Sequence, residues 1–139
     1  AFSYSLRDIK IHNKDANDGG TFIVANYRNL MVWQNSRKLV KQIYDLTGKF
    51  PLEEKFGLAN QIQRAAVSIP SNIAEGYGRN SDKEMIRFLS IAKGSLYEVE
   101  TQLYIAIDLK YLSEKETQPV MEQCNEIGKM ITGLIKTLS

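Results

Sequence analysis

Basic side chains that could bind phosphate groups gather in two short stretches of the sequence. They are, in chain order, Arg37, Lys38, Lys41, Arg79, Lys83 and Arg87. Lysine and arginine side chains that neutralise phosphates supply most of the sequence-independent affinity for nucleic acids. We therefore name these six residues, together with Arg64, as candidate contacts to RNA or DNA. The alternative is ordinary solubilising charge, because the whole chain has a net charge of only +2.

The residues that a metal centre or a nucleophilic enzyme would need are scarce. A di-metal site in a helical bundle uses histidines on two helices, but the one histidine, His12, lies before the helical part of the chain. The one cysteine, Cys124, falls on an apolar helix face, which is typical of a buried small hydrophobic residue. The sequence contains no P-loop, dinucleotide fingerprint or Gly-x-Ser-x-Gly motif. We therefore expect no enzyme activity, no metal and no cofactor.

A set of polar residues, here called the polar stripe, recurs at spacings of three or four and so shares one face of a helix. The polar stripe consists of Gln61, Arg64, Ser68, Asn72 and Glu75. Serine and asparagine are weak helix formers and are unusual choices for a free helix surface. The stripe either faces solvent or makes polar contacts with the following helix or with another subunit. Candidate partners on the following helix are Arg87, Ser95 and Glu98.

Four amphipathic helices must position these side chains. Apolar periodicity and helix-ending signals predict helices at about 29–47, 56–77 and 82–110, and a last helix that opens near Ser113. Long amphipathic helices with short connections favour an all-α fold, an antiparallel up-down-up-down four-helix bundle. We assign the bundle domain to residues 27–139.

The first helix carries two neighbouring apolar stripes. One stripe contains Leu30, Trp33, Arg37, Val40, Tyr44 and Thr47. The other contains Leu39, Ile43 and Leu46. Together they make a broad face for packing.

The second helix contains a proline, Pro70, which cannot donate a hydrogen bond to the carbonyl of Ala66. We expect a kink there, with Ser68, Ser71 or water bonding to freed backbone groups. Gly76 and Gly78 are expected to end this helix.

The sequences that open the last two helices are those of capping boxes, in which serine and glutamate side chains bond reciprocally to each other's backbone amides. These pairs are Ser81 with Glu84, and Ser113 with Glu116. Pro119 lies either in the first turns of the last helix or at its true start. Gly94, inside the third helix, is a candidate point of close approach between helices.

Residues 1–26 differ in composition and are expected to form an irregular N-terminal arm or a short hairpin. An arm with little core of its own would lie on the body or on a neighbouring subunit. The sequence has no apolar run long enough to span a bilayer and no secretory signal pattern. We therefore expect a cytoplasmic protein with no membrane partner.

The stretch Gln61–Gly76, QIQRAAVSIPSNIAEG, resembles the signature of the small four helix bundle proteins named for intervening sequences of bacterial 23S rRNA genes. The resemblance spans about residues 27–139. It implies a bundle that assembles into a homopentameric ring, with no established enzyme activity. It also implies distant kinship with accessory subunits of reverse transcriptases in diversity-generating retroelements, which bind the transcriptase and nucleic acid. The signature positions to which it assigns a structural role are Ser68, Pro70, Asn72, Glu75 and Gly76.

Two functions fit these observations. The first is a non-enzymatic oligomer that associates with nucleic acid, chiefly RNA, through a basic ring surface. The second is a scaffold or accessory subunit that docks a protein partner and has no nucleic-acid role. A continuous basic face would favour the first, and exposed apolar area would favour the second.

Overall fold

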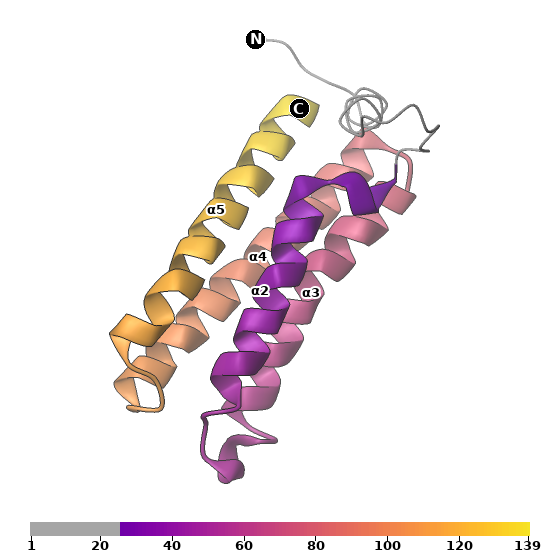
Figure 1. Cartoon of the computed structure of the whole chain (residues 1–139). Helices are drawn as coiled ribbons and strands as arrows, with labels where there is room; N and C mark the ends of the chain where they lie inside the picture. Colours follow the sequence, from indigo (N-terminus) through magenta and orange to yellow (C-terminus); the bar gives the residue numbers. More distant parts are fainter. Residues whose placement is uncertain (1–25) are drawn as a thin grey trace, which may run out of the picture.

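The computed structural model describes residues 26–139, which form a bundle of four long helices (Figure 1). The helices are α2 (Met31–Thr47), α3 (Leu58–Gly78), α4 (Asp82–Asp108) and α5 (Glu114–Leu138). Two short 3-10 turns, η1 (Tyr27–Asn29) and η2 (Leu52–Glu54), precede α2 and α3. The predicted all-α four-helix bundle is confirmed. The predicted N-terminal arm lies outside the described residues, except for Asn26.

Each helix packs on two others, since α2 contacts both α3 and α5, and α4 contacts both α3 and α5. The connections between consecutive helices lie at alternate ends of the bundle (Figure 1). Apolar side chains from all four helices meet in one core. Its largest fully buried members include Leu39, Ile43, Ile69, Ile73, Met85, Leu89, Leu96, Leu103, Ile127 and Ile131.

The buried face of α2 is rotated relative to the first predicted stripe. Leu39, Ile43 and Leu46 are buried in the core, as is Ser36, whose hydroxyl donates to the carbonyl of Val32 at 2.6 Å. Of the first stripe, Leu30 and Thr47 are buried, and Trp33 and Val40 are half-buried against the core. The compact aliphatic stripe fills the bundle, and Arg37 and Tyr44 are exposed.

The last helix opens with a complete capping box, as predicted. The Glu116 amide donates to Ser113 Oγ at 3.1 Å, and the Ser113 amide donates to Glu116 Oε2 at 2.7 Å. At the start of α4, the Glu84 amide donates to Ser81 Oγ at 3.3 Å, but the box is not reciprocal. The Glu84 carboxylate is held instead by Arg87, whose Nε lies 2.7 Å from Glu84 Oε2.

The two helix prolines lie inside continuous helices. Pro119 is within α5, five residues after its first residue, so it does not mark the helix start. Pro70 is within α3, which runs without a break from Leu58 to Gly78. Ser71 Oγ donates to the carbonyl of Val67 at 2.8 Å, so a serine does bond to the backbone beside the proline. The kink itself stays a prediction.

Gly78 is the last residue of α3, as predicted, but Gly76 and Gly94 play different parts from those predicted. Gly76 is buried within α3, where a Cβ atom would lie 2.7 Å from Phe88 Cβ of α4. It marks the close approach of two helices and does not end α3. The turn that follows uses Asn80, whose φ of 57° is left-handed. Gly94 was expected at a close approach, but within the described chain a Cβ there would meet nothing within 4 Å.

Candidate nucleic-acid interface

A basic groove lies on the outer surface of the bundle, along the first half of α2 and the η1 turn. Its lining residues are Arg28, Trp33, Gln34, Arg37, Lys38 and Lys41. A helical repeat of 3.6 residues places Arg37 and Lys41 on successive turns of one face. The groove therefore brings together three of the predicted nucleic-acid contacts, Arg37, Lys38 and Lys41. Arg28, from the η1 turn, adds a fourth cation.

Aromatic rings stand beside two of these cations. The Arg37 guanidinium carbon is 5.5 Å from the centroid of the Trp33 ring, and that of Arg28 is 5.4 Å from the Tyr27 ring. The two rings meet edge to face at a centroid distance of 5.3 Å. Cation–π contact restricts the guanidinium groups without neutralising them. The groove therefore offers positive charge and aromatic surface in one place.

Acidic side chains are sparse around the basic groove. None of its lining residues is acidic. Among residues 26–139, the one carboxylate within ion-pairing distance of a lining residue is that of Asp45, at 3.3 Å from Lys41 Nζ. Both partners of this pair are well exposed, so solvent weakens their attraction. Within residues 26–139, most of the positive charge in the groove is therefore not compensated by neighbouring side chains.

The second predicted cluster, at the turn between α3 and α4, is electrostatically different. Arg79 Nη2 lies 3.1 Å from Glu75 Oε1, and Arg87 pairs with Glu84. Hydrogen bonding from Arg87 lowers the pKa of the Glu84 carboxyl. Both guanidinium groups also stand over the ring of Phe88, at 5.3 and 4.5 Å from its centroid. These arginines are already paired with carboxylates, whereas Lys83 is exposed and forms no ion pair with another residue of the described part of the chain.

The polar stripe of α3 divides between an inner contact and the surface. Ser68 Oγ lies 2.9 Å from Ser95 Oγ of α4, which confirms a predicted contact between the helices. Asn72 Nδ2 donates to the carbonyl and the hydroxyl of Ser68, at 2.7 and 2.9 Å. Gln61 and Arg64 are exposed. Arg64 is thus separate from the basic groove, whose lining it does not join.

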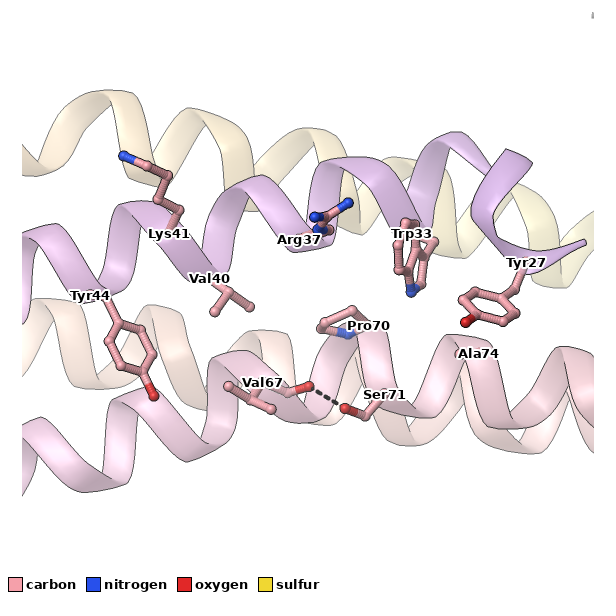
Figure 2. A pocket seen from close by; sticks show the side chains of 10 residues that line it. All are labelled: Tyr27, Trp33, Arg37, Val40, Lys41, Tyr44, Val67, Pro70, Ser71 and Ala74. Carbon is pink, nitrogen blue, oxygen red and sulfur yellow. Dashed lines mark hydrogen bonds between the residues drawn. The ribbon is translucent and has the colours of Figure 1, made fainter. Parts of the chain in front are cut away.

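The remaining signature residues contact other residues of the bundle. Gly76 packs against α4, and Glu75 forms an ion pair with Arg79. Pro70 lies in a second hollow, here called the apolar groove, between α2 and α3 (Figure 2). Its apolar lining consists mainly of Trp33, Val40 and Tyr44 from α2 and of Val67, Pro70 and Ala74 from α3.

Sequence reasoning missed Arg28 and the aromatic partners of the cations. The signal was present in the sequence, because Arg28 directly follows Tyr27 and Arg37 lies four residues after Trp33. A spacing of four places two side chains on one helix face, where a ring and a guanidinium can meet. Trp33 was instead grouped with an apolar packing stripe.

The described residues contain little that could support catalysis. No group of three histidine, cysteine or acidic side chains in residues 26–139 is arranged to hold a metal ion. Cys124 is buried, and burial raises the pKa of its thiol to about 12, so the reactive thiolate is disfavoured. No helix in this part of the chain combines the length and apolar character needed to cross a bilayer.

Comparison with known proteins places these features in a family. The sequence model described as 23S rRNA-intervening sequence protein matches residues 28–133. No protein with a curated description matches the chain. A crystal structure from Bacteroides thetaiotaomicron, described as a protein with unknown function from the S23 ribosomal protein family, is 27% identical and superposes with a TM-score of 0.71. The match covers 77% of this chain and 100% of that one. The chain therefore belongs to the 23S rRNA-intervening sequence protein family.

Proposed function

We propose that the protein is a non-enzymatic oligomer that associates with nucleic acid, chiefly RNA, through the basic groove of α2. The observation that carries this proposal is the groove itself, with four cations, a tryptophan ring and no acidic lining residue. The 23S rRNA origin of the family name is consistent with it. We assign the main contacts to Arg28, Arg37, Lys38 and Lys41.

The chemistry of the groove suits a single strand better than a duplex. Proteins that bind single strands combine cations along the phosphate backbone with aromatic rings on which bases stack. Trp33 is partly exposed, and the cations lie along one helix face beside it. Such contacts discriminate little between base sequences, because every base has a face that can stack.

Assembly into a ring of identical copies, as the family resemblance implies, would repeat this modest basic surface around the ring. Exposed apolar side chains on α4 support self-association. Tyr97, Ile91 and Tyr104 are 51%, 42% and 61% exposed. We propose a homo-oligomer, a pentamer by resemblance, in the cytoplasm. Light scattering that gives the mass of one 15.8 kDa chain at working concentration would contradict this part of the proposal.

The test compares two variants with equal changes in charge. The first reverses Arg37 and Lys38 to glutamate, and the matched control reverses Arg79 and Arg87. Binding of a fluorescent single-stranded RNA of mixed sequence is measured by anisotropy at low salt. The first variant should weaken binding by roughly tenfold or more, and the control by much less, because its arginines already pair with carboxylates. Equal binding by the first variant and the unchanged protein would refute the assignment.

A protein-docking scaffold is the second candidate, and one observation favours it. Leu52, the first residue of η2, and Phe56, which follows η2, are 91% and 87% exposed. Large apolar side chains exposed together mark surfaces that contact other proteins. If this candidate is correct, Leu52→Ser with Phe56→Ser should abolish capture of a specific protein partner. The same change should leave RNA binding as it was.

A further inference from the structure

We propose that the apolar groove between α2 and α3 receives the bases of a bound single-stranded RNA, with Tyr44 as the residue on which a base stacks. This inference rests on the proposed function, because it takes the phosphates to lie on the cations of the basic groove. The strand would follow α2 with its phosphates on the cations and its bases turned towards α3.

The basic groove and the apolar groove share one edge. Trp33, Arg37 and Lys41 line both of them. The helical repeat of 3.6 residues places Lys38 on one side of this edge and Val40 on the other side, towards α3. A strand that lies along the edge can therefore direct its phosphates to one side and its bases to the other.

Apolar side chains on both walls of the apolar groove are open to a ligand. Tyr44 and Val67, on opposite walls, are 49% and 41% exposed. Val40 and Pro70 are half-buried beside them (Figure 2). Every base has a face that can stack on such a surface. Covering that face together with these side chains removes apolar area from water, which is favourable in proportion to the area.

Tyr44 offers the most exposed aromatic ring of the apolar groove. Trp33 is half-buried, and its ring centroid lies 5.3 Å from that of Tyr27 and 5.5 Å from the Arg37 guanidinium carbon. Among residues 26–139, no aromatic ring contacts Tyr44 and no cation stands over it. Tyr44 is therefore better placed than Trp33 to take a base on the face of its ring.

The length of the apolar groove fits a short stretch of RNA. From Trp33 to Tyr44 the helix rises about 16 Å at ~1.5 Å per residue. Stacked nucleotides rise ~3.4 Å each, so about five would cover this distance, and an extended strand would need fewer. Arg37 and Lys41 are about 6 Å apart along the helix axis at the same rise per residue. Phosphates of one strand can therefore reach both cations.

The apolar groove contains few polar groups that could read the edge of a base. Pro70 has no amide hydrogen. The hydroxyl of Ser71 already donates to the carbonyl of Val67 at 2.8 Å (Figure 2). Recognition there depends on stacking and apolar contact, which tolerate every base. We expect purines to bind more tightly than pyrimidines, because their larger rings cover more apolar area.

Charge favours a nucleic acid over an apolar peptide as the occupant of this groove. Arg37 and Lys41 line it, and none of its lining residues in the described part of the chain is acidic. An apolar peptide would cover these cations without pairing them, and burial of an unpaired charge is costly. A strand of RNA instead places phosphates beside the cations and bases beside the apolar walls.

The test separates the contribution of the bases from that of the phosphates. The two ligands are an oligoadenylate of about ten nucleotides, within the range of single-strand site sizes, and an abasic strand of equal length and charge. Binding of each is measured by anisotropy at one low salt concentration. The proteins are the unchanged chain, Tyr44→Ala, Tyr44→Phe and Leu109→Ala, which truncates an exposed apolar side chain outside the groove.

The unchanged protein should bind the oligoadenylate more tightly than the abasic strand. Tyr44→Ala should weaken binding of the oligoadenylate about fivefold or more, the factor expected when one stacked base loses its ring. The same change should leave binding of the abasic strand as it was. Tyr44→Phe keeps the ring, so it should bind both strands like the unchanged protein, as should Leu109→Ala. Circular dichroism checks that all the variants remain helical.

Photocrosslinking gives an independent reading that needs no variant. An oligouridine that carries bromouridine is irradiated with the unchanged protein, and the crosslinked tryptic fragments are identified by mass spectrometry. The fragment of residues 42–49 contains Tyr44 as its one aromatic residue and should carry the base.

The outcomes distinguish this inference from the proposed function. Equal affinity of Tyr44→Ala and the unchanged protein for the oligoadenylate would overturn the role of Tyr44, as would crosslinks confined to fragments outside the groove. Equal and salt-dependent binding of the two strands would overturn base binding but leave the phosphate contacts of the basic groove in place. Failure of both strands to bind at low salt would overturn both proposals.

Discussion

Replacement of Gly76 by alanine tests the close approach of α3 and α4 at this position. The added Cβ would lie 2.7 Å from Phe88 Cβ and 3.1 Å from Met85 Sδ. Carbon atoms in favourable contact are about 3.5–4.0 Å apart. Phe88 Cβ is fixed to the backbone of α4, so the contact can be relieved only if α3 and α4 move apart by most of an ångström.

Two opposing effects determine the expected change in the free energy of unfolding. Overpacking of this kind costs about 1–3 kcal/mol. Replacing a glycine by alanine inside a helix gains about 1 kcal/mol. Gly94→Ala is the matched control, because Gly94 is inside α4 and a Cβ there meets nothing within 4 Å. Both variants share the propensity gain, so Gly76→Ala should be less stable than Gly94→Ala by about 1–3 kcal/mol.

Urea unfolding followed by circular dichroism measures this difference. The proteins must be compared at one concentration, because the stability of an oligomer depends on it. The unchanged protein should fall between the two variants or close to Gly76→Ala. Equal free energies of unfolding for the two variants would refute the close approach of α3 and α4 at this position.

Three further outcomes are expected from particular contacts. Hydrogen bonds from Lys49 and from the Ser113 amide lower the pKa of Glu116 to about 2, below its usual value of 4.5. This carboxylate therefore stabilises the fold above about pH 4.5 and loses that effect as the pH falls towards 2. Glu116→Gln should flatten the fall of the urea midpoint over that range, and an unchanged acid profile would contradict the assignment. Ser68→Ala should cost about 0.5–1.5 kcal/mol in urea unfolding by removing the hydrogen bond to Ser95, and a double mutant with Ser95→Ala should cost less than the sum of the single changes. Cys124 should react with iodoacetamide at pH 8 only after unfolding, and rapid labelling of the folded protein would disprove its burial.

Much of the fold could be predicted from local sequence signals. Aliphatic residues at helical spacing predicted the four helices, and the Ser113–Glu116 box predicted the start of α5. These features depend on neighbours within a few residues. The reciprocal bond that was predicted at Ser81 does not form, because Glu84 has a choice of partners and pairs with Arg87 in the folded helix.

The roles of the glycines and of the candidate site depended on tertiary packing. Gly76 and Gly94 both lie inside helices, but Phe88 passes close to the first and no atom comes within 4 Å of a Cβ at the second. The two basic clusters also looked equivalent from the sequence alone. Pairing of Arg79 and Arg87 with carboxylates distinguishes the turn cluster from the basic groove.

The proposed function is tested most directly by the salt dependence of RNA binding. A short single-stranded RNA is titrated with the unchanged protein by anisotropy at several potassium chloride concentrations. Each phosphate neutralised on a single strand contributes about −0.7 to the slope of log affinity against log salt concentration. Contacts from Arg28, Arg37, Lys38 and Lys41 predict a slope of about −2.8, reduced in the Arg37→Glu, Lys38→Glu variant. No binding at low salt, or an affinity that does not change with salt, would contradict nucleic-acid association through the basic groove.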